Sequence, residues 1–574
     1  MTNPPTGQQQ RATASHLPLA GAALLTLLGF LPIANWIAGG HEAPWYGSVV
    51  GEWLSGSAIA LGLGVVLAIL SRRAPALWRE GLWQRIATAG WRRPALTTAV
   101  LVVAALAVYA LVARTVFDAR PMLIDEIAQF YQAQTFADGH LWRPAPAHPE
   151  FFDMLQTIAH DGRVFAQFPP GAPAFLALGI AAGLPWLVGP LCGALTVWAF
   201  VAYLRVAEPR PGVALAAALL LAFAPFTLFM AGSYMNHVPA LLCLVVAIAA
   251  LAHVTASPRP RPLLAFANGL ALGTAATIRP VDAMAFALPA GVWYLTRAIR
   301  DRRRWSETLS AGVGVAIPIT LLMAYNVVTT GRPLLFGYQL LWGSSHDLGF
   351  HAAPWGPVHT PARGLELVNL YVLRLQTYLF ESPIPSLLPA IVALALTRSL
   401  DALDRYLLAC GALLLAFYFA YWHDGFYLGP RFVYPLLPLL ALWTARFPSR
   451  LRAAAGEGTA FRVAIYALGV SAVISLLVTV PLRAHEYGSR LSTMREDVVA
   501  AARRAGAREA IVLVRESWGS QLVARLHALG VAPGEVELIY PRVDACQLEL
   551  AITRLEREPR RSGSAFDALR PLLR

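Results

Sequence analysis

The chain has 574 residues, of which 57% are hydrophobic and 14% charged, and its net charge of +13 comes from arginine without any lysine. A soluble globular domain carries roughly 25% charged residues, so this composition excludes a water-soluble protein. The arginines lie between long apolar segments, which favours a role in membrane topology over nucleic-acid binding.

Long apolar segments recur through most of the chain, and many approach the roughly 20 residues that span a bilayer. The first follows a polar N-terminus, residues 1–16, and its length favours a retained anchor over a cleaved signal peptide. We predict an all-α polytopic membrane protein with about thirteen transmembrane helices. The predicted spans are 17–39, 48–70, 94–116, 187–206, 212–230, 236–255, 263–278, 282–298, 307–328, 383–397, 405–421, 431–447 and 462–482.

Arginine is concentrated in alternate linkers of this pattern. The richest are segment 71–93 and the linker after residue 298, and all the arginine-rich linkers fall on one side of the predicted bundle. The positive-inside rule makes that side cytoplasmic. The N-terminus is then cytoplasmic, whereas the large loops 117–186 and 329–382 and the C-terminal tail face outward. The predicted location is the plasma (inner) membrane of a bacterium.

The first outer loop places two adjacent carboxylates, Asp125 and Glu126, just past the third span, on a segment of helical character. Charged groups at the membrane surface are costly unless they are solvated or used, and a carboxylate there can act as a general base toward a hydroxyl. The alternative is a solvated helix N-terminus, where the helix dipole favours acidic residues.

The same loop closes with Phe168-Pro169-Pro170-Gly171-Ala172-Pro173, followed by an apolar segment that ends near Leu184. This segment is too short to span, so we expect it at the membrane interface. A second motif, Gly429-Pro430-Arg431-Phe432-Val433-Tyr434-Pro435, opens a late span.

In this order and topology, the acidic pair, the proline-rich closure, the short interfacial helix and the late motif resemble the GT-C superfamily of membrane glycosyltransferases. The resemblance is greatest to the glycosyltransferase family 39 type, with protein O-mannosyltransferases and the lipid A aminoarabinose transferases as relatives, and it covers roughly residues 94–447. It implies a membrane catalytic domain over 94–482. It leaves as additions two N-terminal spans with a basic cytoplasmic loop over 17–93, and a tail over 483–574.

The resemblance also implies an activity. Its members are inverting glycosyltransferases that take a hexose or pentose from a polyprenyl-phosphate donor, on the extracytoplasmic face, to a hydroxyl of a lipid, glycan or protein. Asp125 is then the candidate base, with Glu126 beside it to orient a partner or substrate. The family often carries a second acid in the next outer loop, but this chain has Gly232-Ser233-Tyr234-Met235-Asn236-His237 there.

Binding the donor phosphate requires cations. Arg279, at the tip of the short hairpin Arg279-Pro280-Val281-Asp282, and Arg431 are the main candidates, and Arg163, Tyr131 and His237 complete the predicted substrate-binding set. An arginine within the membrane is a functional hypothesis. The alternatives are a structural Arg279–Asp282 pair and ordinary interfacial anchoring of Arg431.

Loop 329–382 interleaves aromatic with polar residues, which suits either a sugar or lipid surface or an interfacial aromatic belt. Its histidines, His346, His351 and His359, have no recognised metal-binding spacing, and the four cysteines form no disulfide or zinc pattern. We therefore assign no metal site, and no cofactor is predicted with assurance, although a divalent metal stays open.

The tail differs from the rest of the chain in composition. It reads as a strand over 510–514, a helix over 518–529 and a strand over 536–540, which predicts a small extracytoplasmic α/β domain. The competing hypothesis for the whole chain is a transporter or flippase of lipid-linked sugars, but such proteins show internal repeats and broken helices at the midplane, and the sequence shows no repeat.

Overall fold

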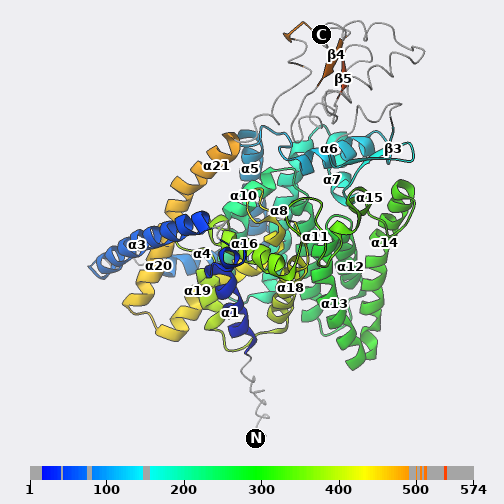
Figure 1. Cartoon of the computed structure of the whole chain (residues 1–574). Helices are drawn as coiled ribbons and strands as arrows, with labels where there is room; N and C mark the ends of the chain where they lie inside the picture. Colours follow the sequence, from blue (N-terminus) through cyan, green and yellow to red (C-terminus); the bar gives the residue numbers. More distant parts are fainter. Residues whose placement is uncertain are drawn as a thin grey trace, which may run out of the picture.

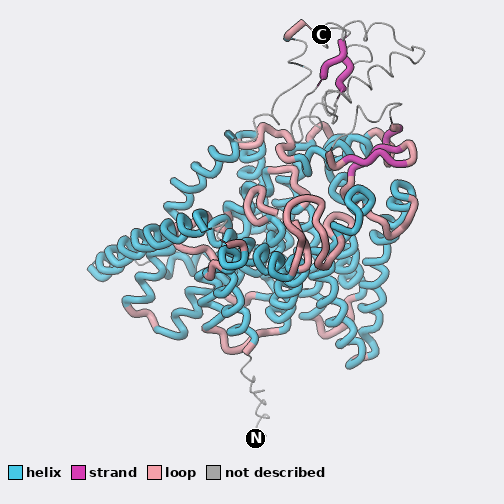
Figure 2. The backbone as a smooth tube through the Cα atoms, viewed as in Figure 1, coloured by secondary structure: helices cyan, strands magenta, loops and turns pink. Residues whose placement is uncertain are grey.

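A computed structural model describes residues 16–39, 43–73, 80–145, 155–423 and 425–489, together with 500, 504–506, 510–513 and 536–539. Most of this is helix, and the strands of the described residues form only small sheets (Figure 2). The α-helices are α1 (Leu17–Phe30), α2 (Ile33–Ile37), α3 (Ala43–Arg73), α4 (Glu80–Arg92), α5 (Pro94–Thr115), α6 (Ile124–Ala137), α7 (Gly171–Ala181), α8 (Val188–Ala207), α9 (Pro211–Phe223), α10 (Pro225–Gly232), α11 (His237–Ala256), α12 (Pro262–Ala276), α13 (Pro280–Arg300), α14 (Trp305–Thr330), α15 (Gly337–Trp342), α16 (Pro361–Tyr378), α17 (Leu388–Ala395), α18 (Ala402–Phe419), α19 (Leu437–Ala455), α20 (Thr459–Ile474) and α21 (Val480–Ser489).

Every predicted span coincides with helix, but the helices differ in length and polarity. Among the described residues, seven helices are long and apolar enough to cross a membrane, and an eighth crossing results if α9 and α10, bent by 45°, are one span. The other predicted spans are shorter, such as α1 and α12, or carry several charges, such as α13 with Asp282, Arg297 and Arg300. The polytopic helical fold is therefore confirmed, and the total of thirteen stays a prediction.

Helices α12 and α14 pack closely because two glycines let their backbones meet. A Cβ atom at Gly269 would lie 2.0 Å from the carbonyl oxygen of Ala311, and one at Gly314 would lie 2.4 Å from that of Phe266. Small residues allow such contact where lipid gives no hydrophobic drive for helices to associate.

The first outer loop forms a cap at one end of the bundle. Helices α6 and α7 lie there with a three-stranded antiparallel sheet of β1 (Arg143–Pro144), β3 (Arg163–Ala166) and β2 (Thr157–His160), in that order. Figure 1 shows α6, α7 and β3 at the upper end of the helical bundle, whereas α1 begins and α13 and α14 meet at the opposite end. The predicted helix at the acidic pair and the short helix after the proline-rich closure are both present.

In the tail, β4 (Ala510–Leu513) and β5 (Val536–Ile539) form a parallel pair, with Ala510 opposite Val536. These are the two strands predicted from the sequence. A parallel pair requires a crossover connection, and the helix predicted over 518–529 lies outside the described residues.

A buried ionic network holds the α8–α9 linker, α18 and α19 together. Arg446 on α19 donates from Nε to Glu208 Oε2 at 2.9 Å and from Nη1 to Asp404 Oδ1 at 2.7 Å. Glu208 also binds Arg210, at 2.7 Å from Nε to Oε1. The network ties the α8–α9 linker to α18 and α19, and all three central side chains are nearly inaccessible to solvent.

Removing one partner from such a network leaves an uncompensated buried charge, which costs about 3–5 kcal/mol. We expect Arg446→Met to lower the thermal unfolding midpoint of the purified protein clearly, because Asp404 loses the arginine it pairs with. The matched control is Arg398→Met at an exposed arginine, which should leave the midpoint nearly unchanged. Equal midpoints for the two variants would contradict this account.

Candidate active site

A cavity of about 300 Å³ lies between the cap and the helical bundle. Six parts of the chain contribute residues to this cavity. They are α6, the β2–β3 hairpin and the segment after it, the α10–α11 turn, the α12–α13 turn, the loop after α14, and the region from the end of α18 to residue 432. The lining residues include Asp125, Gln156, His237, Arg279, Tyr338, His346, Trp355, Tyr418, His423, Arg431 and Phe432.

Asp125 reaches this cavity from the first turn of α6. Its Oδ1 accepts a hydrogen bond from Gln156 Nε2 at 2.7 Å, and its Oδ2 pairs with Arg431 Nη2 at 2.9 Å. The side chain is 16% exposed. The carboxylate is thus held from two sides and still borders open space, which is the geometry that a general base needs.

Arg431 is placed by the turn that precedes it. Gly429 has a φ of +103°, and a Cβ there would lie 3.1 Å from the ring of Tyr378. Glycine therefore suits this turn, which directs Arg431 into the cavity. The arginine is 5% exposed, and within the described residues its Nε and Nη1 have no hydrogen-bond partner.

Arg279 belongs to a second charged group in the same cavity. Its Nε pairs with Asp282 Oδ2 at 2.5 Å and its Nη2 donates to the Tyr418 hydroxyl at 2.7 Å, while Tyr418 donates in turn to Asp282 Oδ1. The structural pair expected as the alternative is therefore present, and Arg279 lines the cavity as well. The α12–α13 turn therefore faces a cavity, as the short apolar segments on either side of it predict.

Phe432 lies close to both cations. The guanidinium carbons of Arg279 and Arg431 are 5.2 and 5.7 Å from its ring centroid, and the Tyr418 ring stacks on it at 4.9 Å. Cation–π contact stabilises the two guanidinium groups near each other. Two positive charges are therefore held on one wall of the cavity.

The proline-rich closure fixes the α12–α13 turn against the cap. The Gly171 amide donates to Thr277 O at 2.8 Å, and a Cβ at Gly171 would lie 2.4 Å from Thr277 Oγ1. The glycine of this motif therefore lets the loop approach the turn that carries Arg279.

Glu126, which we predict to orient a partner or substrate, is not among the residues that line the cavity. Its Oε2 accepts from the backbone amides of Met122 and Leu123 at 2.6 and 3.1 Å, and its Oε1 accepts from that of Tyr234 at 3.2 Å. The side chain is 1% exposed, and burial raises its pKa to about 7, against the lowering effect of the three amides. Its contacts make Glu126 a helix cap that joins α6 to the α10–α11 turn.

The remaining predicted site residues are divided between the cavity and its surroundings. His237 lines the cavity; its ring stacks on Phe432 with centroids 6.2 Å apart, and neither ring nitrogen has a hydrogen-bond partner within the described residues. Tyr131 instead packs with Ile127 and Ala166 inside the cap. Arg163 lies over the Trp142 ring and donates to the carbonyl of Val328, outside the cavity.

The loop after α14 contributes an aromatic wall that the sequence indicated only as one of two alternatives. His346 stacks parallel to Tyr338 at 5.8 Å and meets the edge of Trp422 at 5.2 Å, and Trp355 packs against Trp422 at 4.8 Å. Burial, and to a lesser degree the neighbouring histidines His423 and His351, lowers the pKa of His346 to about 4. The imidazole is therefore neutral at pH 7 and contributes a flat aromatic face.

Sequence reasoning missed several lining residues, above all Gln156 and Tyr418. Neither belongs to a recognisable motif, and each acquires its role only through a partner distant in sequence. Within the described residues, no group of three or more His, Cys, Asp and Glu side chains could hold a metal ion.

No protein-family profile matches the sequence, and no curated protein matches it significantly. The chain does match solved structures. ArnT from Cupriavidus metallidurans in the apo state has a TM-score of 0.50 and 16% identity, and the match covers 76% of this chain and 85% of ArnT. The same protein bound to undecaprenyl phosphate gives 0.49 and 15%, covering 77% and 89%. The oligosaccharyltransferase of Archaeoglobus fulgidus gives 0.37 and 11%, covering 76% and 64%.

The match to apo ArnT shows that the two proteins share a fold. The narrower resemblance to glycosyltransferase family 39 stays a prediction.

The raised pKa of Glu126 makes the stability of the cap depend on pH. A carboxyl group whose folded-state pKa is about 7, against 4.5 ordinarily, binds a proton more tightly when folded. Its contribution is therefore fully present below about pH 4.5 and is lost as the pH rises through about 7, by up to about 3 kcal/mol. We expect thermal unfolding midpoints to show this fall between pH 4.5 and 7 in the wild type and to show less of it in Glu126→Gln. Parallel pH profiles for the two proteins would contradict this assignment.

Proposed function

We propose that the chain is a membrane glycosyltransferase that transfers a sugar from a polyprenyl-phosphate donor to an acceptor hydroxyl on the extracytoplasmic face. The observation that carries this proposal is one carboxylate, Asp125, in the same cavity as two guanidinium groups, Arg279 and Arg431. Transfer from a sugar phosphate requires a base that accepts the proton of the acceptor hydroxyl and positive charges that bind the phosphate. The solved ArnT structure that contains undecaprenyl phosphate supports this donor class.

In the proposed reaction, Asp125 accepts the proton of the acceptor hydroxyl as its oxygen attacks the anomeric carbon. The bond from that carbon to the phosphate oxygen breaks, and the polyprenyl phosphate leaves with the electron pair. Arg279 and Arg431 stabilise the negative charge that grows on the phosphate. A single displacement of this kind inverts the configuration at the anomeric carbon.

Arg431 suits the phosphate because two of its donors have no partner within the described residues. A guanidinium can bind a phosphate with two parallel hydrogen bonds. Its Nη2 could keep its contact with Asp125 meanwhile, so that the base and the leaving group are placed by the same side chain.

The aromatic wall formed by Tyr338, His346 and Trp355 suits the sugar or the acceptor, because flat aromatic faces pack against the apolar faces of sugar rings. The sugar, which can be a hexose or a pentose, and the acceptor, which can be a lipid, glycan or protein, are open. The alternative of a transporter or flippase is less well supported, because such proteins are built from internal repeats and the sequence shows none.

Asp125→Asn keeps the size of the side chain and removes its basicity, so we expect transfer to fall by at least about a hundredfold. The lipid-linked glycan profile of a deletion strain, complemented with each variant, measures the loss. Asp161→Asn is the matched control, since the Asp161 side chain is 78% exposed and lies outside the cavity. Full complementation by Asp125→Asn at wild-type protein levels would refute the assignment of the base.

Arg431→Gln should weaken the binding of undecaprenyl phosphate by about tenfold or more, because charge-assisted hydrogen bonds to the phosphate are lost. Arg431→Lys should restore only part of it, since a lysine lacks the planar fork. Binding is measured on purified protein by titration with undecaprenyl phosphate. Arg163→Gln, outside the cavity, is the control, and an equal loss in both variants would contradict a phosphate site at Arg431.

A further inference from the structure

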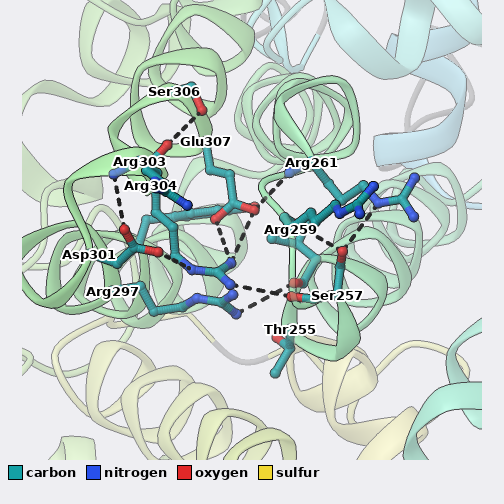
Figure 3. Close-up of polar contacts among 12 residues, drawn as sticks. Thr255, Ser257, Arg259, Arg261, Arg297, Asp301, Arg303, Arg304, Ser306 and Glu307 are labelled. Carbon is teal, nitrogen blue, oxygen red and sulfur yellow. Dashed lines mark hydrogen bonds and ion pairs between the residues drawn. The ribbon is translucent and has the colours of Figure 1, made fainter.

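The end of the bundle opposite the cap carries a second feature that the proposed reaction does not use. Segments 257–261 and 297–307, which join α11 to α12 and α13 to α14, contain seven arginines and two acidic residues. Their net charge of +5 is gathered where the two linkers lie side by side (Figure 3).

Both acidic residues are occupied within this region. Glu307 is inaccessible to solvent; its Oε1 accepts from the Arg261 backbone amide at 2.8 Å and its Oε2 pairs with Arg304 Nη1 at 3.4 Å. Arg304 also pairs with Asp301 at 3.5 Å and donates to the carbonyl of Pro258 at 3.0 Å. These contacts clamp the two linkers together, as Figure 3 shows.

The clamp leaves several arginines pointing outward. Arg259, Arg300, Arg302 and Arg303 are exposed, and the described residues offer no acidic partner to their side chains. We call these four residues, with the exposed Arg261, the linker patch. Because the linkers are fixed to each other, the patch is a rigid array of charges in place of a flexible basic tail.

Apolar side chains continue from the linker patch along the helices. Leu263, Ile299 and Leu309 are 78%, 75% and 64% exposed, and Trp305 is also exposed beside the patch. Exposed leucine and isoleucine on an apolar helix face lipid, and tryptophan is enriched at the level of the lipid headgroups. The linker patch therefore lies at the level of the lipid headgroups, next to apolar side chains that acyl chains can contact.

We propose that the linker patch binds the headgroup of an anionic phospholipid, whose acyl chains lie along α13 and α14. Basic pockets between transmembrane helices bind anionic headgroups of this kind. Topology alone asks for positive charge near the span ends and does not account for a patch whose two acids are withdrawn into a clamp. The inference is independent of the proposed reaction.

The test uses the full-length protein in detergent and native mass spectrometry with added lipid. Wild-type protein should retain cardiolipin or phosphatidylglycerol in preference to phosphatidylcholine. An arginine near an anionic lipid surface contributes about fivefold to binding, so the double variant Arg302→Gln with Arg303→Gln should lose at least about tenfold. The side chains of Arg302 and Arg303 take no part in the clamp, so the variant should keep the wild-type melting temperature.

The matched control is Arg92→Gln with Arg93→Gln, which removes two exposed arginines at the end of α4. This variant should keep its cardiolipin. An equal loss in both double variants would overturn the proposal in favour of non-specific surface charge, as would equal retention of phosphatidylcholine by the wild type. Glycerol 3-phosphate binding as tightly as the phospholipid would also overturn it, because the acyl-chain surface would then contribute nothing.

Discussion

The ion pair between Asp125 and Arg431 is the contact on which the candidate site depends, because it joins the cap to the motif that precedes α19. It forms in a setting where two charges are largely removed from water, and a lone charge there would be costly. The pair therefore holds α6 in the orientation that brings Asp125 to the cavity. It also brings the acid in the first outer loop into contact with the motif at residue 431, although more than half of the chain separates them.

Two other arginines with little exposure, Arg446 and Arg279, are matched more completely. Arg446 is shared between Glu208 and Asp404, and Arg279 between Asp282 and Tyr418. Arg431 differs, because it has one partner and two donors without any in the described residues. His237, beside it on the Phe432 ring, likewise has no partner for either ring nitrogen there. A native structure rarely keeps buried polar groups unsatisfied without cause, and a bound anion would satisfy Arg431.

The sequence predicts some of these features well and others not at all, for physical reasons. Hydropathy locates the helices because the bilayer imposes their length and composition. The acidic pair indicates the start of α6 because adjacent carboxylates are rare next to an apolar span. Helical periodicity could have gone further: at about 100° per residue, Tyr131 lies about 240° from Asp125, on the far side of α6. Glu126 also turns away. It accepts from the amides of Met122 and Leu123, which are close in sequence, and from that of Tyr234, which comes from a distant turn that no local pattern reveals. Whether an apolar helix of 15 residues such as α12 crosses the membrane depends on its neighbours, so the count of spans does not follow from hydropathy.

Gln156 shows what else sequence reasoning lacks. It is a neutral residue in a loop, yet its φ is +64°, a conformation that costs a non-glycine residue energy and persists only where its surroundings impose it. A carboxylate can only accept hydrogen bonds, so the amide must present its Nε2 to Asp125, and this leaves its buried Oε1 without a donor in the described residues. The strained backbone and the unsatisfied oxygen are both accounted for if Gln156 serves to orient the carboxylate. Because Gln156 binds Oδ1 and Arg431 binds Oδ2, the carboxylate group of Asp125 is not free to rotate. The lone pairs that remain on its oxygens are the ones that an acceptor hydroxyl can reach.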